Sequence, residues 1–193
     1  MPGIDYLESN RKIAHIIVGV ILAALVYAGW LSWWIVLIAL IIGIIISMIF
    51  MHYDIPVIGW FLRVFERPHF IKRFPARGVI YLFIGLLVVT ALFDKNIAAA
   101  AVLIWAFGDS VSALIGRYGN IKHPLNNERL IEGTLAGIVV ATLASSLLVG
   151  LGKAFVASLI TLSLESLELK FLKDTLDDNL MVPVIAALIL YLI

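Results

Sequence analysis

Long runs of apolar residues dominate the chain, and short segments that carry the charged side chains separate them. A helix needs about 20 apolar residues to cross the roughly 30 Å hydrocarbon layer of a bilayer. The first run, residues 13–50, contains no Asp, Glu, Lys or Arg and is too long for one crossing. Gly29 and the tryptophans between residues 30 and 34 therefore predict an interfacial turn that divides this run into two helices.

The same reasoning predicts about seven membrane-spanning helices along the chain. They cover about 13–29, 33–51, 78–93, 97–116, 133–152, a stretch that begins after Lys153 and runs into Glu165, and 179–193. The third, sixth and seventh of these are short. Because a bilayer core holds no water to pair with the backbone, the spans must be helical. The predicted fold class is all-α: a polytopic membrane protein with one integral-membrane domain over residues 1–193.

Composition supports this class and excludes others. Hydrophobic residues make up 63% of the 193 residues and charged residues 14%, against about 45–50% and 25% in soluble domains. The net charge of +1 gives no basic surface for nucleic acid. The chain has no cysteine, which excludes disulfides, thiolate catalysis and cysteine-based zinc sites.

The distribution of basic residues predicts the orientation. Seven crossings place the N-terminus and the segments 51–77, 117–132 and 170–178 on one side of the membrane. That side holds 12 of the 14 Lys and Arg residues, and the other side holds Lys95 and Lys153. The positive-inside rule makes the crowded side cytoplasmic. In segment 51–77 aromatic and basic residues interleave, which favours cytoplasmic helices that lie in the membrane interface.

The first candidate constellation precedes the first span. Glu8, Arg11, Lys12 and His15 are spaced i, i+3, i+4 and i+7, so a helix places them on one face. A charged helix start with snorkelling side chains accounts for Arg11 and Lys12. It does not account for His15, which points along the same face into apolar sequence.

The second candidate is Asp109, which lies within the fourth predicted span. An ionised Asp inside a span costs about 2.5–3.5 kcal/mol on insertion scales, so such residues usually face a partner, a cavity or an ion. Ser112, Ala113 and Gly116 follow on the same face and allow a helix or ligand to approach the carboxylate. The structural alternative is that Asp109 pairs with an Arg or Lys of another helix.

The loop after this span has the composition of a phosphate-binding segment. Gly116 and Gly119 free the backbone to turn its N–H groups onto an anion, and three cations follow. These cations are Arg117, Lys122 and Arg129. Neither a P-loop nor a Rossmann glycine motif occurs in the chain. Gly133 and Gly137 form a small-xxx-small pair, which favours close helix packing.

The remaining acids lie around the last two spans. Glu165 is near the cytoplasmic end of the sixth span, and Asp177, Asp178 and Asn179 open the seventh. Two adjacent acids and a carboxamide suit the oxygen shell of Mg²⁺. The alternative is that Asp178 or Asn179 is only the N-cap of the last helix.

These motifs together resemble the CTP-dependent lipid kinases, the family of dolichol and other polyprenol kinases, phytol kinases and fungal-type diacylglycerol kinases. The matching strings are Glu8-x-x-Arg11-Lys12-x-x-His15, Gly108-Asp109 with Ala113 and Gly116-Arg117-x-x-Gly119, Glu132-Gly133, and Glu165 followed by Asp177-Asp178-Asn179-Leu180 and Pro183. They span most of the chain. One departure is that the family commonly has Lys-Ser or Lys-Thr before Glu-Gly, whereas this chain has Arg129-Leu130-Ile131.

The resemblance implies that CTP phosphorylates a membrane-embedded lipid alcohol, with dolichol or another polyprenol as the expected substrate. It implies that Asp109 ligates Mg²⁺, with Asp177 or Asp178 as further ligands. The implied nucleotide-binding residues are Gly108, Gly116, Arg117, Gly119, Lys122, Arg129, Glu132 and Gly133. The base for the lipid hydroxyl stays open between His15, Glu8 and Glu165, and Arg11 and Lys12 steady the transferring group.

Two other functions remain open on the sequence. A CTP-dependent cytidylyltransferase that acts on a phosphorylated lipid, such as a CDP-archaeol or CDP-diacylglycerol synthase, also uses a Gly-Asp helix, CTP and Mg²⁺. Its later Asp-rich motifs and the Glu-x-x-Arg-Lys-x-x-His entrance do not match this chain. A small transporter with Asp109 and Glu165 along an ion path needs charged mouths on both faces, whereas the outer loops carry only Asp94, Lys95 and Lys153.

Overall fold

The computed structural model of the protein describes residues 2–53, 55–66, 68–71, 73–123, 126–166 and 177–193. Within these ranges the regular secondary structure is helical apart from one β-hairpin. The helices are α1 (Pro2–Tyr27), α2 (Trp33–Phe50), α3 (Pro56–Phe65), α4 (Pro68–Ile71), α5 (Arg77–Leu92), α6 (Lys95–Gly116), α7 (Ile131–Val149), α8 (Leu151–Ser166) and α9 (Asp178–Leu192). The hairpin consists of β1 (Lys122–His123) and β2 (Asn126–Leu130), which are antiparallel.

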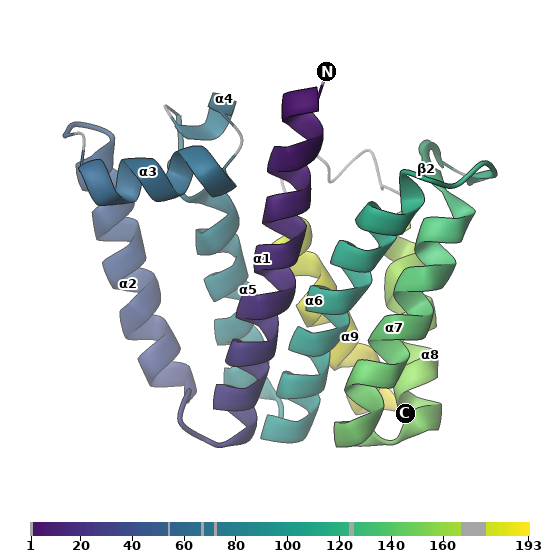
Figure 1. The fold of residues 1–193 in the computed structure, drawn as a ribbon. Helices are drawn as coiled ribbons and strands as arrows, with labels where there is room; N and C mark the ends of the chain where they lie inside the picture. The colour runs from purple at the N-terminus through teal and green to yellow at the C-terminus, as the bar shows by residue number, and fades with distance from the viewer. Residues whose placement is uncertain (1, 54, 67, 72, 124–125, 167–176) are drawn as a thin grey trace.

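The longer helices run side by side as a bundle with α6 near its centre (Figure 1). Helix α6 packs against α1, α5, α7, α8 and α9, whereas α2 packs mainly against α5. Helices α3 and α4, the hairpin and the N-terminus lie at one end of the bundle, and the C-terminus lies at the other (Figure 1). This end, which we call the loop end, therefore gathers the N-terminus and the described parts of segments 51–77 and 117–132, which the sequence places on the cytoplasmic side.

Four helices are long and apolar enough to cross a membrane: α1 from Glu8 onward, α2, α6 and α7. Helices α5 and α9 are apolar but shorter. The membrane-protein class is thus supported by four helices, whereas the predicted total of seven crossings is not decided by helix length and composition. The predicted turn at Gly29 is confirmed, because this residue has a φ of +77°, a conformation that glycine adopts at little cost.

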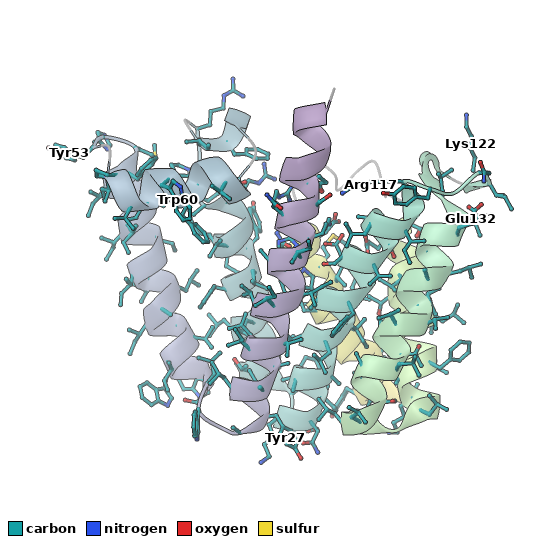
Figure 2. The ribbon with its side chains drawn as sticks, viewed as in Figure 1. Tyr27, Tyr53, Trp60, Arg117, Lys122 and Glu132 are labelled. Carbon is teal, nitrogen blue, oxygen red and sulfur yellow. The ribbon has the colours of Figure 1, made fainter. Side chains whose placement is uncertain are left out.

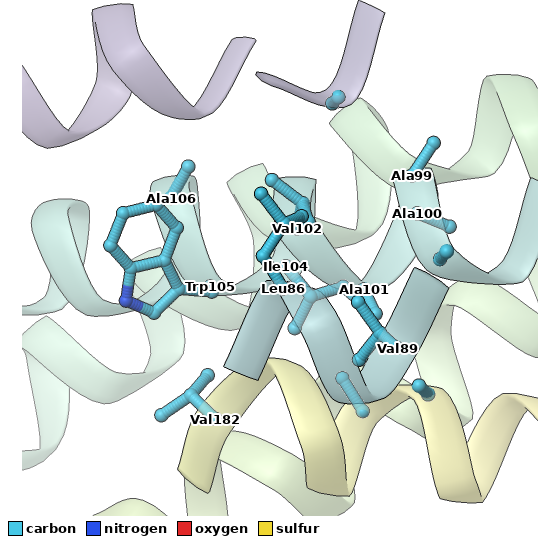
Figure 3. Packing of buried hydrophobic residues seen from close by; sticks show 14 of the residues in the cluster. Leu86, Val89, Ala99, Ala100, Ala101, Val102, Ile104, Trp105, Ala106 and Val182 are labelled. Carbon is cyan, nitrogen blue, oxygen red and sulfur yellow. The ribbon is translucent and has the colours of Figure 1, made fainter. Parts of the chain in front are cut away.

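Apolar side chains fill the interior and also cover much of the outside. Trp105, Ile104 and Leu86 are fully buried around the middle of α6 (Figure 3). Alanines 98–101 are also fully buried, so neighbouring helices come close to the first turns of α6. Only 17% of α2 is buried, although it is the most hydropathic of the candidate spans. An apolar helix that is exposed over most of its surface is typical of contact with lipid.

Small residues allow α7 to lie against α6. A Cβ at residue 133 would overlap the carbonyl oxygen of Ser112, and a Cβ at residue 137 would overlap the Ser112 hydroxyl. The same Cβ at 137 would lie 2.7 Å from the carbonyl oxygen of Gly108. The close helix packing predicted for Gly133 and Gly137 is therefore confirmed.

We expect Gly137→Ala to destabilise the protein, because its methyl group has no room against α6. Overpacking of this kind typically costs about 1–3 kcal/mol. Gly43→Ala on α2 is the matched control, since a Cβ there meets no atom within 4 Å. In a helix this control exchange is favourable by about 0.5–1 kcal/mol. Thermal unfolding in detergent measures both, and equal melting temperatures for the two variants would contradict the packing described here.

The all-α fold class is confirmed, and within the predicted loop 117–132 the structure adds a short β-hairpin that the sequence analysis did not predict. Lys122 of β1 pairs with Leu130 of β2, with a register shift between Lys122 and His123. The backbone N–H and C=O groups of a connection between two helices need hydrogen-bond partners. In the hairpin the two short strands provide these partners for each other. In segment 51–77, α3 lies across the loop end (Figure 1) and packs against α1. Its Val57, Trp60 and Phe61 are exposed, as an interfacial helix requires (Figure 2).

Candidate active site

Lys12 and Asp109 form a buried ion pair between α1 and α6. The Lys12 Nζ atom donates to both carboxylate oxygens of Asp109, at 2.7 Å to Oδ1 and 2.6 Å to Oδ2. The exposed fractions of the two side chains are 9% and 7%. This is the interhelical pairing that the structural alternative for Asp109 describes. The pair joins two of the four helices that form the site.

His15 lies next to the same carboxylate. Its Nδ1 atom is 3.7 Å from Asp109 Oδ2 and makes no hydrogen bond to a described atom. The His15 ring also lies against the indole of Trp105, with ring centroids 5.1 Å apart and planes tilted by 49°. The predicted helical face is therefore present, and its Lys12 and His15 both reach Asp109.

The other two members of that face interact with each other. Arg11 donates to Glu8 at 2.7 Å, and both side chains are partly exposed. Ser9, between them in sequence, contacts Arg117 at 2.8 Å through its hydroxyl group. This contact places the start of the 117–132 loop beside the N-terminal part of α1. Arg117 and the predicted α1 residues thus lie at the same end of the bundle.

Two further carboxylates converge on Asp109 from α8 and α9. Oxygen atoms of Asp109, Glu165 and Asp178 all lie within 4.8 Å of one another. Gly108 makes this possible on the α8 side, because a Cβ at residue 108 would lie 2.7 Å from the Leu162 side chain. Leu162 is one turn before Glu165, so the close approach at Gly108 brings the Glu165 carboxylate to α6. Glu165 is partly buried and Asp178 is exposed.

Asp177 has a different position from the one that the sequence favoured. Its side chain accepts a hydrogen bond from the backbone N–H of Asn179 at 3.1 Å and so caps α9. It also lies 3.8 Å from Arg77 Nε, and the Arg77 guanidinium lies over the rings of Phe70 and Tyr81. The N-cap is therefore Asp177 rather than Asp178 or Asn179. Of the two predicted acids, Asp178 is the one that lies with Asp109.

The 117–132 loop is closed at its base by Glu132. Its carboxylate accepts hydrogen bonds from the backbone N–H groups of Asn120 at 2.8 Å and Ile121 at 3.1 Å. A Cβ at residue 119 would lie 2.7 Å from this carboxylate, which explains the glycine there. Two backbone N–H groups of the loop that was predicted to bind phosphate thus donate to Glu132 instead. The role of Glu132 seen here is to fix the loop.

The three cations of this loop differ in their positions. The Lys122 side chain is exposed on the hairpin, and Arg117 lies nearer to α1 (Figure 2). Arg129 lies in β2, but its side chain is outside the described part of the chain. Gly116 faces Gly133 across the α6–α7 contact, where a Cβ would lie 3.7 Å from the Gly133 Cα atom. Gly108, Gly116 and Gly133 therefore occupy helix contacts.

Two residues near the site have polar interactions that the sequence analysis did not predict. The Trp105 Nε1–H group donates to Asn179 Oδ1 at 3.1 Å. The Asn179 Nδ2–H group donates to the carbonyl oxygen of Gly78 at 3.3 Å. Tryptophan in an apolar span looks like a core residue, and no local pattern identifies its partner, which is 74 residues away.

The assembled site contains one ammonium group, one imidazole and three carboxylates from four helices. With all carboxylates ionised and His15 neutral, these five side chains carry three negative charges and one positive charge. Like charges this close destabilise one another unless a cation or protons compensate them. The arrangement can hold a divalent cation, and His15 beside it can accept a proton.

Comparison with known proteins places the chain in a family. No protein-family model matches it, and no solved structure matches it. The chain is 31% identical over 186 residues to the protein of Methanocaldococcus jannaschii named uncharacterized protein MJ1137. The match covers 95% of this chain and 92% of MJ1137, so the two proteins correspond over nearly their whole lengths. The chain therefore belongs to the same protein family as MJ1137.

Proposed function

We propose that the protein is an integral-membrane kinase that transfers the γ-phosphoryl group of CTP to the hydroxyl group of a lipid alcohol. Dolichol or another polyprenol is the expected substrate. The observation that carries this proposal is the convergence of Lys12, His15, Asp109, Glu165 and Asp178 at the loop end of the bundle. A soluble nucleotide reaches this end, while the tail of the alcohol stays in the bilayer.

The three carboxylates suit Mg²⁺. Carboxylate oxygens are hard ligands of the kind that Mg²⁺ binds at about 2.0–2.1 Å, so opposite ligands lie about 4.2 Å apart. At most one pair among three such ligands is opposite, and adjacent ligands lie about 3 Å apart. The oxygens of Asp109, Glu165 and Asp178, which lie within 4.8 Å of one another, therefore have to move closer together to bind one Mg²⁺. When bound, Mg²⁺ supplies neutralisation of charge on the phosphate oxygens. Asp177 is set apart from these ligands by its capping hydrogen bond.

The Lys12–Asp109 pair alone does not explain this arrangement. A packing role for Asp109 requires one partner, and Lys12 provides it. It gives no reason for Glu165 and Asp178 to bring two more carboxylates to the same place. A site that receives a cation and a triphosphate does give a reason. On binding, Lys12 is then free to donate to the transferring phosphoryl group, and Arg117 and Lys122 supply further donors.

His15 is the base for the lipid hydroxyl in this proposal. Among the three candidates, Glu8 is paired with Arg11 and Glu165 lies with the metal-binding carboxylates. An Nδ1–H group of His15 directed toward Asp109 leaves Nε2 as the proton acceptor. The hydroxyl oxygen then attacks the γ-phosphorus, and CDP leaves. Phosphoryl transfer needs mainly positioning and charge stabilisation, which these side chains supply.

The proposal includes a topology. Helices α1, α2, α5, α6, α7, α8 and α9 cross the membrane, and the loop end with the N-terminus and the active site faces the cytoplasm. The excess of Lys and Arg in the segments at this end supports this orientation. Trp60 and Phe61 of the exposed face of α3 are then at the depth of the lipid head groups.

A labelling experiment tests the function. The purified protein in nanodiscs receives CTP labelled in its γ-phosphate, Mg²⁺ and either a lipid alcohol or a phosphorylated lipid. The panel contains dolichol, shorter polyprenols, phytol and diacylglycerol, with ATP as the alternative donor. We expect label in the lipid when CTP and a polyprenol are present. Label released as pyrophosphate identifies a cytidylyltransferase instead, and ion or solute movement in proteoliposomes without nucleotide consumption identifies a transporter.

A further inference from the structure

We infer that Trp105 and Asn179 are positioning residues that hold His15 in its place beside Asp109. They form a continuous chain of contacts from α5 through α9 and α6 to α1. The functional consequence rests on the proposed kinase reaction, in which His15 accepts a proton. The positioning itself does not depend on that reaction, so it is open to a separate test.

The indole of Trp105 is fixed by one hydrogen bond at a fully buried position. Its exposed fraction is 0%, and a buried indole N–H group requires an acceptor. Asn179 Oδ1 is that acceptor, at 3.1 Å. The orientation of the indole plane is therefore set by the location of the Asn179 carboxamide.

Hydrogen bonds of its side chain and of its backbone hold Asn179 in place. Its Nδ2–H group donates to the Gly78 carbonyl oxygen of α5 at 3.3 Å, and the backbone N–H group of Asn179 donates to Asp177. A Cβ at residue 78 would lie 3.1 Å from Nδ2 of Asn179, so the glycine allows this approach. Both polar atoms of the side chain are thus engaged within the protein. Asn179 is accordingly assigned to support of the site and not to the metal shell.

His15 lies on the side of the indole that faces α1. The two rings are 5.1 Å apart, and Gly19, one turn further along α1, allows the α1 backbone to lie close to α6 beside the indole. A Cβ at residue 19 would overlap the Ala106 side chain and lie 3.3 Å from Trp105 Cζ3. Because His15 Nδ1 has no hydrogen bond to a described atom, ring packing against Trp105 is a main constraint on its orientation.

The test uses three variants: Trp105→Phe, Asn179→Leu and the two combined. Trp105→Phe keeps an aromatic ring but lacks the N–H group, and Asn179→Leu is close in shape but lacks the acceptor. The probe is the pair of ring signals of His15 in NMR spectra of histidine-labelled protein in nanodiscs, at one pH and without nucleotide. Absence of these signals in His15→Gln assigns them. We expect Asn179→Leu to displace them, because the indole stays but moves relative to His15, whereas Trp105→Phe shifts them through loss of the indole itself and serves as the reference for a changed ring current.

Turnover separates positioning from stability. Each single variant leaves a buried polar group without its partner and lowers the melting temperature, whereas the combined variant removes both partners and regains much of it. Loss of a group that orients a metal-binding side chain typically costs about 10–100-fold in activity, and we use the same range for groups that orient His15. We expect a loss of this size in kcat for the single and combined variants, with KM for CTP unchanged. If the combined variant regained turnover as well as stability, Trp105 and Asn179 would have only a structural role.

Two matched exchanges elsewhere serve as controls. Asn96→Leu and Trp34→Phe change the same residue types at exposed positions, at the bundle end opposite the site. Both should leave the His15 signals and turnover unchanged. Unchanged His15 signals in Asn179→Leu would overturn the inference. A wild-type protein that phosphorylates no lipid would overturn the proposed function instead, while the NMR result would still decide whether the network positions His15.

Discussion

Asp109→Asn is expected to abolish turnover while the helical bundle stays folded. The exchange removes the negative charge that Lys12, His15 and the metal site share. It keeps a side-chain oxygen that accepts a hydrogen bond from Lys12, and Lys12 is close enough to the start of α1 to extend toward the interface. Loss of one group that stabilises charge in a transition state typically costs at least about 100-fold. We expect a loss of that order or larger in kcat/KM for CTP.

A readout that does not require activity accompanies this prediction. If Asp109 helps to bind Mg²⁺, added Mg²⁺ raises the melting temperature of the wild-type protein more than that of Asp109→Asn, because a ligand stabilises the state that binds it. Asp94→Asn is the matched control on the same helix. Asp94 caps α6 at its opposite, exposed end, and Asn is an equally good N-cap. Near-normal turnover of Asp109→Asn would remove Asp109 from the active site.

Hydrophobic length predicts most helices of this fold. The predicted spans about 33–51, 78–93 and 97–116 differ by at most two residues at either end from α2, α5 and α6. Within a bilayer an apolar run of this length has to form a helix, because only a helix pairs all of its own backbone groups. The hairpin at 122–130 was not predicted. Its strands are short and polar, and their pairing arises only when α6 and α7 hold the ends of the segment together.

The sequence predicts which residues belong to the site, but it does not predict which of them contact each other. The i, i+3, i+4, i+7 spacing identifies the face that carries Lys12 and His15, because both positions belong to one helix. The contact of Lys12 with Asp109 joins residues 97 positions apart, which no local pattern shows. Likewise Asp177, Asp178 and Asn179 are all favourable N-caps. Only the packing of α9 decides that Asp177 caps the helix and Asp178 faces Asp109.

Lys12→Met is expected to destabilise the protein strongly and to make its stability depend on Mg²⁺. Methionine keeps an unbranched apolar stem but leaves Asp109 buried without its ammonium partner, next to Glu165 and Asp178. Removal of one member of a buried ion pair typically costs about 3–5 kcal/mol. The control is Lys153→Met, since Lys153 is an exposed residue in the first turn of α8. Thermal unfolding of both variants in detergent measures the difference.

The Mg²⁺ dependence distinguishes a cation site from a packing ion pair. If the three carboxylates bind Mg²⁺, loss of the competing Lys12 ammonium increases the stabilisation by added Mg²⁺ above that of the wild type. Combining Lys12→Met with Asp109→Asn removes the unpaired charge and should restore much of the stability but none of the turnover. Equal stabilisation of wild type and Lys12→Met by Mg²⁺ would contradict a shared site. Lys12 would then serve Asp109 only as a structural partner, since its ammonium and the metal would not compete for the same oxygens.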